Sequence, residues 1–548
     1  MTDRGYWSKR MPARISRRRA LASGLSLTAG AATWAACGGG DGTPPADAGP
    51  RRGGTLRTGT TAAFSGLDPQ TETGTGLAIT ARLYGYLLHV DPRDDSIIYD
   101  QAAQVEQPDA TTFVFKLRPG IEFHDVEPVH GRTLSAEDVV ASIERFRRNP
   151  IATTKTFHTT VLDRVEAMDE LTVRVTTKRP YAYSLAYLGD ISAGAILAKE
   201  LIEQEVSLYT AAAGSGPFQL EQAQPPGRAR IVRNDGYYRG PVPYLDAMEW
   251  EVFTEGTSLN AAMLDGAIDS IPAGAQQDAR TLAAEREEIE VTAEPSLSWL
   301  ALGTRMDVPP LHDPRVRGAI DLALDRDAMI RDIAGGDGRI LGPVNPHLAE
   351  GYWALFENDV REAFGGSATM DERRSAARQL LMAAGAERAA FTLQVANLAP
   401  MLDVAGVVKE QLLEIGIAVE VQPQDLLVWF TNFRRGAFQL TLVSQPPYET
   451  ADIPLRFFHS RGPDGSGSPF AFADGTTDSL IERSWGELER EQRRKTVQEA
   501  QKLMIFQRPM MELFTSVGYS AAWSRVRNRR PGLPGSLAQY NYEQWIAE

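Results

Sequence analysis

The sequence is poor in cysteine and in basic charge. Cys37 is its single cysteine in 548 residues, so no intrachain disulfide can form. The fold must therefore be stabilised by its hydrophobic core, and a chain of this length can bury a large one. The formal net charge is −14, which argues against nucleic acid or an anionic bilayer as the main partner. Length alone allows about two to four domains.

Long apolar runs and catalytic motifs are also missing. After residue 37, no segment is long and apolar enough to cross a bilayer. The chain has no Gly-x-Ser-x-Gly elbow and no His-Glu-x-x-His motif. Gly336-Asp337-Gly338 is a near miss for a dinucleotide loop, with the wrong spacing, and indicates a surface turn. We expect a protein that is not an enzyme, with a hydrolase as the least favoured alternative.

The histidines are scattered along the chain. There are seven of them, and no two have the close spacing that is typical of a metal site in a protein. The sequence therefore predicts neither a tightly bound metal nor a cofactor.

The first 36 residues have the composition of an export signal. Arg17-Arg18-Arg19 precede an uncharged stretch, Ala20–Ala36, which ends in small residues directly before Cys37. Such an order is typical of a signal peptide. Since the uncharged stretch is short and weakly apolar for a spanning helix, we expect residues 1–36 to be removed. An uncleaved membrane anchor and a plain free thiol are the alternatives.

Two segments of the leader resemble known export motifs. Trp34-Ala35-Ala36-Cys37 resembles a bacterial lipobox, with Trp34 where leucine is usual, and residues 16–21 resemble a twin-arginine motif. The resemblance implies a lipid on Cys37 and a place on the periplasmic or extracytoplasmic face of a membrane. Residues 37–54 are rich in glycine, proline and alanine, so we expect a flexible tether.

From Thr55 onward, strand and helix patterns are interspersed. Alternating β-branched and aromatic residues predict strands, while 3.6-residue periodicity with capping residues predicts helices. Asp313 and Pro314 suit the start of one helix, and Gly385 suits the end of another. The mixture predicts an α/β fold. The strands are expected at 55–58, 112–117, 171–177, 417–421 and 439–443, and the helices at 134–146, 314–332, 371–384, 404–414 and 478–506, the last broken near Trp485.

A series of short sequence motifs resembles those of one protein family. The motifs occur in the same order as in that family and along almost the whole chain after residue 54. The family is the large extracytoplasmic solute-binding proteins of ABC importers, which include oligopeptide-, dipeptide- and nickel-binding proteins. The motifs that carry the resemblance are Leu67-Asp68-Pro69, residues 117–125, Leu134-Ser135-Ala136-Glu137-Asp138-Val139, Gly214-Ser215-Gly216-Pro217-Phe218, residues 234–239, Pro243-Tyr244-Leu245-Asp246, Gly266-Ala267-Ile268-Asp269 and residues 313–326.

The resemblance implies a two-lobed periplasmic-binding-protein fold of type II with an extra inserted domain. Lobe I would comprise residues 55–90, 211–295 and 505–548, the extra domain 91–210, and lobe II 296–504. A small solute, peptide-like or another organic molecule, would be enclosed when the lobes close by hinge bending. The protein would be a monomer that delivers this solute to an ABC permease. Sensing or chaperone activity without transport is the alternative.

Candidate ligand-binding residues lie where the strands of the two lobes are expected to end. A cleft needs aromatic walls and a few polar groups. Lobe I offers side chains after its first strand, and lobe II offers aromatic and polar groups near the expected hinge and after its strands. These residues are Thr60, Thr61 and Phe64 in lobe I, and Trp299, Trp429, Gln445 and Tyr448 in lobe II.

The segment around Tyr448 bears on the identity of the solute. In peptide-binding members of the family this region carries an Asp-Tyr pair, whose carboxylate meets the free amine of the peptide. Here no aspartate precedes Tyr448. Because a buried ammonium needs a counter-charge, Glu449 or Asp452 would have to supply it. The sequence therefore leaves the ligand open.

Overall fold

Three β-sheets organise the residues that the computed structural model describes. These residues are 49–91, 93–148, 156–208, 212–274, 276–297, 299–445, 448, 450–463, 465–530 and 542–547. Cys37 and the leader lie outside them, so lipidation, cleavage and the greater part of the tether stay predictions.

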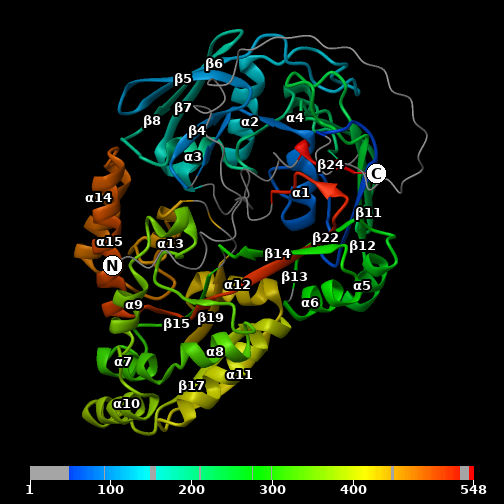
Figure 1. Ribbon diagram of the computed structural model, residues 1–548. Helices are drawn as coiled ribbons and strands as arrows, with labels where there is room; N and C mark the ends of the chain where they lie inside the picture. The colour runs from blue at the N-terminus through cyan, green and yellow to red at the C-terminus, as the bar shows by residue number, and fades with distance from the viewer. Residues whose placement is uncertain are drawn as a thin grey trace, which may run out of the picture. The chain divides into compact units, whose positions relative to one another are not determined.

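The largest sheet has seven strands and is built from three separate parts of the chain (Figure 1). The first strand is parallel to both of its neighbours, and the strands toward the two edges pair antiparallel. In sheet order the strands are β10 (Phe218–Gln224), β11 (Arg228–Arg233), β12 (Ala247–Val252), β1 (Thr55–Thr60), β13 (Ser270–Gly274), β22 (Val517–Trp523) and β14 (Ile289–Pro295).

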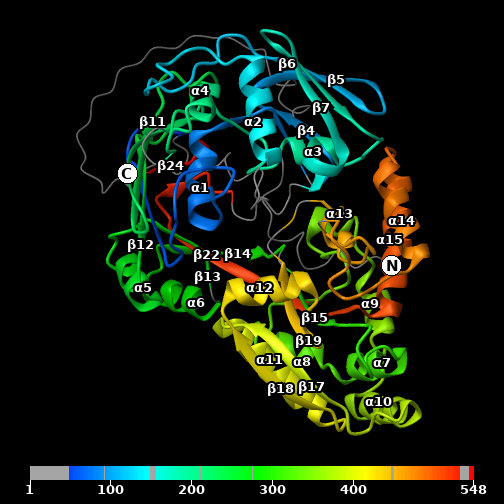
Figure 2. The same cartoon turned by 180° about the vertical axis from the view of Figure 1, so that it is seen from behind.

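The second sheet has five strands and a mixed pattern of pairing. Helices cover it: Figure 1 and its reverse view, Figure 2, show α7, α8 and α11 beside its strands. In sheet order the strands are β18 (Ala418–Gln424), β17 (Ala390–Ala396), β19 (Leu440–Gln445), β15 (Trp299–Thr304) and β20 (Met510–Glu512). Buried Leu302, Leu393 and Leu442 belong to the core of this part.

The third sheet is antiparallel and lies within residues 102–177. Its strands are β5 (Ala102–Asp109), β6 (Thr112–Leu117), β8 (Thr172–Thr177) and β7 (Leu162–Asp169). Tyr181 and Tyr187 follow this sheet, and both donate their hydroxyl protons to Asp452, at 2.5 and 2.9 Å. This buried contact fixes the four-stranded part to the region of the five-stranded sheet.

The remaining elements are helices and four two-stranded ladders. The helices are α1 (Gly74–Leu83), α2 (Ala136–Arg148), η2 (Phe157–Val161), α3 (Ser184–Leu188), α4 (Lys199–Glu203), α5 (Gly256–Leu264), α6 (Gln276–Glu285), α7 (Pro314–Ala323), α8 (Arg326–Asp332), η3 (Leu348–Gly351), α9 (Glu357–Ala363), α10 (Met370–Ala384), α11 (Ala399–Leu413), α12 (Leu426–Arg435), α13 (Asp452–Arg456), α14 (Gly475–Gly486) and α15 (Arg490–Gln507). The ladders join β2 (Gly85–Tyr86) with β9 (Ala195–Ile196), β3 (Leu88–Asp91) with β4 (Ser96–Tyr99), β16 (Arg339–Ile340) with β21 (Phe514–Thr515) and β23 (Val526–Arg527) with β24 (Trp545–Ile546).

Most of the predicted elements are confirmed, and one helix is corrected. The predicted helix 314–332 is two helices, because the chain leaves helical geometry at Leu324 and Asp325. The Asp325 side chain accepts a hydrogen bond from the Ala328 backbone at 2.9 Å and so caps the second helix. Asp313 caps α7, and Gly385 ends α10 in the left-handed conformation, both as predicted.

The predicted boundaries of the lobes stay a prediction, but the strands can be assigned to sheets. Strands within 55–60 and 218–295 lie in the seven-stranded sheet, and those within 299–445 lie in the five-stranded sheet, except β16, which pairs with β21. The segment 505–548 is divided between the sheets, since β20 pairs with β15 while β22 pairs with β13. A Cβ atom on Gly214 would lie 1.8 Å from the Leu83 carbonyl oxygen, so only glycine fits at this crossing.

None of the helices in the described part of the chain combines the length and apolar character that a bilayer span requires.

Candidate ligand-binding site

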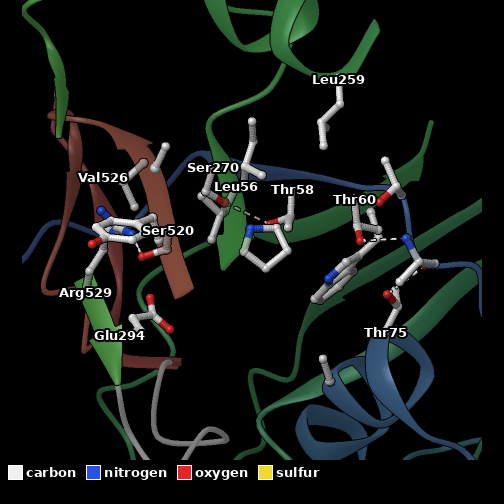
Figure 3. Close-up of a pocket in the computed structure, with 18 of the residues that line it drawn as sticks. Leu56, Thr58, Thr60, Thr75, Leu259, Ser270, Glu294, Ser520, Val526 and Arg529 are labelled. Atoms are coloured by element: carbon white, nitrogen blue, oxygen red, sulfur yellow. Dashed lines mark hydrogen bonds between the residues drawn. The ribbon is translucent and has the colours of Figure 1, made fainter. Parts of the chain in front are cut away.

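A cavity of about 670 Å³ lies against the seven-stranded sheet (Figure 3). Four neighbouring strands, β12, β1, β13 and β22, contribute to its walls, together with helices α1, α5 and α6. Residues from the chain after β22 complete it, among them Val526 and Arg529. Distant parts of the sequence therefore meet in one concave surface.

The floor of the cavity carries a row of hydroxyl groups. Thr58 is the register partner of both Trp250 and Ser270, so these three side chains share one face of the sheet. The Thr58 and Ser270 hydroxyls lie 3.1 Å apart in a hydrogen bond. Figure 3 shows Ser520, Ser270 and Thr58 in succession along this floor. Such a row offers donors and acceptors to a polar solute.

The predicted residues Thr60 and Thr61 both line this cavity. Thr60 ends β1, and its hydroxyl accepts a hydrogen bond from the Ala62 N–H at 3.0 Å. The Thr75 hydroxyl on α1 donates to the Ala62 carbonyl at 2.8 Å. These two bonds hold the loop after β1 against the helix, while the side chain of Thr61 stays exposed.

Arg82 supplies a buried positive charge to the cavity wall. It lies on α1, its side chain is among those that line the cavity, and the residue is only 7% exposed. One guanidinium nitrogen donates to the Ala78 carbonyl of the same helix, and the group stacks over the Trp250 ring at 5.7 Å. Its Nε has no hydrogen-bond partner. Burial lowers the pKa of Arg82 to about 10, so the group remains charged at neutral pH.

Arg529 supplies a second guanidinium, in a different electrostatic setting. It donates to the Ser520 hydroxyl at 2.9 Å. Burial lowers the pKa of Arg529, and the charges of Glu294 and Glu290 oppose that shift. Glu294 also lines the cavity, as does Asp278. This part of the wall therefore carries charges of both signs.

Three other predicted site residues are buried in the core. Phe64 is 3% exposed and belongs to the largest hydrophobic cluster. Trp429 lies on α12, stacks on Phe433 with ring centroids 5.6 Å apart, and donates its indole N–H to the Thr441 hydroxyl at 3.1 Å. Tyr448 is 3% exposed, and its hydroxyl accepts a hydrogen bond from the Asn345 N–H at 2.7 Å. None of the three lines the sheet cavity.

Trp299 and Gln445 are register partners at one end of the β15–β19 pair. Their backbones are described, and their side chains lie outside the described part of the structure. Glu449 also lies outside it. Asp452, the other substitute for the missing aspartate, is fully buried and accepts hydrogen bonds from Tyr181, Tyr187, Thr450 and Arg456.

The structure brings forward residues that the sequence did not single out. Arg82, Trp250, Ser270 and Ser520 enter the cavity only through the folding of distant segments, and no local pattern marks them. Beside the buried Trp429, α12 exposes a group of apolar side chains. Leu426, Leu427 and Val428 are 49%, 75% and 52% exposed. A helix that exposes consecutive apolar residues suggests a contact surface, which a hydropathy scan of 426–430 would have detected.

In the part of the chain that is described, no group of three or more His, Cys, Asp or Glu side chains is placed to hold a metal ion. The prediction of a metal-free site stays a prediction.

Comparison with proteins of known sequence gives partial matches. The glutathione-binding protein GsiB of Escherichia coli K12 is 26% identical over 245 residues, which is 44% of this chain and 46% of that protein. GsiB of Pectobacterium atrosepticum is 25% identical over 224 residues, 41% of this chain and 42% of the relative. The chain thus aligns with less than half the length of these curated relatives.

Solved structures match over nearly the whole described chain. A dipeptide-binding protein from Pseudoalteromonas sp. SM9913 in complex with Met-Leu has a TM-score of 0.75 at 19% identity, covering 90% of this chain and 100% of that one. AgaA from A. tumefaciens R10 in complex with agropinic acid has a TM-score of 0.73 at 23% identity, covering 90% and 99%. At such identities the match establishes the fold, which is the predicted periplasmic-binding-protein fold of type II.

The family itself is established by a match to a sequence model. Residues 97–462, more than half of the chain, match the middle region of the bacterial extracellular solute-binding proteins, family 5. The matched range begins in β4 and ends shortly after α13. The chain therefore belongs to the bacterial extracellular solute-binding proteins of family 5.

Proposed function

We propose that the protein is the substrate-binding component of an ABC importer, which captures a small solute and passes it unchanged to a membrane permease. The observation that carries the proposal is the cavity of about 670 Å³ in a chain of a solute-binding family. This volume lies within the roughly 300–1,000 Å³ that small-molecule sites usually have. Its hydroxyl floor and two guanidinium groups suit a polar organic solute.

In this proposal the solute is held from two sides. Thr60 and Thr61 contact it from the seven-stranded sheet. The side carrying the five-stranded sheet would contribute the exposed apolar residues of α12 together with Trp299 and Gln445. Phe64, Trp429 and Tyr448, all buried, would support these surfaces from the core. Hinge bending would close the two sides around the solute, and desolvation would strengthen the polar contacts.

The solute is proposed to have the size of a short peptide or an amino-acid conjugate. The relatives described above are glutathione-binding proteins, and the two solved structures are complexes with the dipeptide Met-Leu and with agropinic acid. The size of the cavity agrees with molecules of that class.

Native mass spectrometry of protein purified from its own host tests the proposal. We expect one small molecule per chain, recovered chemically unchanged after denaturation. Adding that molecule back to stripped protein is expected to raise the melting temperature, because it binds the folded state. Recovery of a chemically altered product would favour the hydrolase alternative instead. Failure of every peptide-sized solute to bind would contradict the proposal.

We propose further that Cys37 carries a lipid that keeps the protein at the membrane. An acylated cysteine anchors a protein through its buried chains. The Cys37→Ser variant is expected to move from the membrane fraction to the soluble fraction and to bind solute as the wild type does. A variant that stays in the membrane fraction would indicate an uncleaved anchor.

A further inference from the structure

We infer that the sheet cavity selects an organic anion and that Arg82 holds its carboxylate. The inference rests on the proposed function, since it names the class of solute for the same cavity. It is carried by the position of Arg82, by its lack of a counter-charge and by the polar floor beside it.

Arg82 is a buried cation without an ion-pair partner among the residues that the structure describes. Its guanidinium contacts the Ala78 carbonyl and the face of Trp250 and interacts electrostatically with the Tyr86 hydroxyl, while its Nε is left without an acceptor. An unpaired buried charge is unfavourable unless something compensates it. A guanidinium presents parallel N–H donors that fit the two oxygens of a carboxylate. Arg82 is among the residues that line the cavity.

Other arginines near Arg82 form ion pairs with carboxylates of the protein and serve as a comparison. A second hollow of about 430 Å³ is lined by Arg57, Arg228 and Arg230. Arg57 pairs with Asp269 at 2.9 Å, and Arg228 and Arg230 pair with Glu251 and Glu249. Thr58 and Trp250 line both hollows. The guanidinium groups on β1 and β11 are therefore compensated in one hollow, while Arg82 on α1 is uncompensated in the other.

The floor of the cavity indicates how an extended solute would lie in it, from Arg82 toward Arg529. Trp250, beneath Arg82, lies on β12, and Ser520, which binds Arg529, lies on β22. Strands β1 and β13 lie between them, so three inter-strand steps separate these ends, roughly 14 Å. An extended molecule with its carboxylate at Arg82 would pass over the Thr58 and Ser270 hydroxyls toward Arg529.

The acidic groups of the cavity do not replace the missing counter-charge. Glu294 and Asp278 line it, but neither lies within ion-pairing distance of Arg82. Glu294 acts on Arg529, whose pKa its charge raises against the effect of burial. The far end thus presents a cation and an anion together, which suits the polar, zwitterionic end of an amino-acid derivative. Arg82 remains available for an anion.

The test compares Arg82→Met with Arg230→Met, which removes a guanidinium from the paired hollow. Isothermal titration would use glutathione, the dipeptide Met-Leu, the C-terminal amide of Met-Leu and inorganic phosphate, at matched ionic strength. We expect an acid probe to bind the wild type and Arg230→Met equally, and Arg82→Met at least about tenfold more weakly. The corresponding amide is expected to bind the wild type as weakly as the acid binds Arg82→Met.

Stability without ligand provides a second readout. If Arg82 serves a ligand, Arg82→Met is expected to keep or raise the melting temperature of the empty protein, because it removes an uncompensated buried charge. A clear fall would indicate a structural role and overturn the inference. So would equal binding of acid and amide, binding of phosphate alone, absence of binding by every probe, or a co-purified solute without a negative group. Binding of a neutral solute would still support the proposed function.

Discussion

Two hollows flank the same pair of strands, and they differ in whether the arginine side chains that line them have carboxylate partners. Thr58 on β1 and Trp250 on β12 line both. In the smaller hollow every arginine meets a carboxylate of the fold. In the larger one, Arg82 meets none among the described residues. A guanidinium group that is paired with a carboxylate of the protein stabilises the packing of the strands. A guanidinium group that has no such partner is available to bind an incoming anion.

Asp269 shows how the paired hollow holds the sheet together. Its carboxylate accepts from Arg57 of β1 at 2.9 Å and from Arg525, beyond β22, at 2.7 Å. It also accepts from the backbone N–H of Arg57 at 2.8 Å, and its side chain is 3% exposed. One carboxylate therefore joins strand β1 to the turn after β22, two segments that are far apart in the sequence.

The largest effect is expected for Asp269→Asn. The substitution would leave the guanidinium groups of Arg57 and Arg525, which are 38% and 34% exposed, without the buried carboxylate that they share. Because solvent reaches both guanidinium groups, we expect a loss of about 3 kcal/mol in the free energy of unfolding, the lower end of the range for breaking a buried pair, measured by urea denaturation.

The matched control for that experiment is Arg230→Met. Arg230 pairs with Glu249 and Glu221 at the partly exposed edge of the same hollow, and pairs of this kind contribute about 0.5 kcal/mol or less. Equal effects of the two substitutions would remove the distinction between a buried anchor and a surface pair.

Local signals in the sequence account for much of the fold. Strand 112–117 and the ends of the helices at Asp313 and Gly385 were predictable because capping and alternation act over a few residues. The break at Asp325 was missed, since an aspartate within an amphipathic pattern resembles an exposed helix residue until its side chain is seen to cap α8.

The candidate site was predictable only where it follows a single strand. Thr60 and Thr61 come directly after β1, and the end of a strand can be read locally. Arg82 could not be predicted as a site residue, because an arginine on a helix is usually exposed. This one packs against Trp250 of strand β12, which is far away in the sequence. Ser520 reaches the floor through a pairing between β13 and β22, which no local pattern encodes.

Glu512 on β20 is the counterpart of Arg82 with the opposite sign. Its side chain is 1% exposed, and neither carboxylate oxygen has a hydrogen-bond partner. Burial raises the pKa of Glu512 to about 8, with Arg326 lowering it and Asp321 raising it. A carboxyl group can escape the cost of burial by keeping its proton, while a guanidinium cannot in the physiological range. Glu512 therefore needs no counter-ion at neutral pH, and Arg82 does.

This difference predicts a pH dependence that the Glu512→Gln variant removes. Because the pKa is higher in the folded state than its ordinary value of 4.5, the unfolded chain loses the proton first, and stability falls as pH rises from about 4.5 to about 8. The full shift corresponds to about 5 kcal/mol, and structural relaxation reduces this to an expected loss on the order of 3 kcal/mol. Urea denaturation at pH 5 and pH 9 measures it. The gap between Glu512→Gln and wild type should be small at pH 5 and widen toward pH 9. A constant gap would mean that Glu512 keeps one charge state throughout, and the contrast with Arg82 would then disappear.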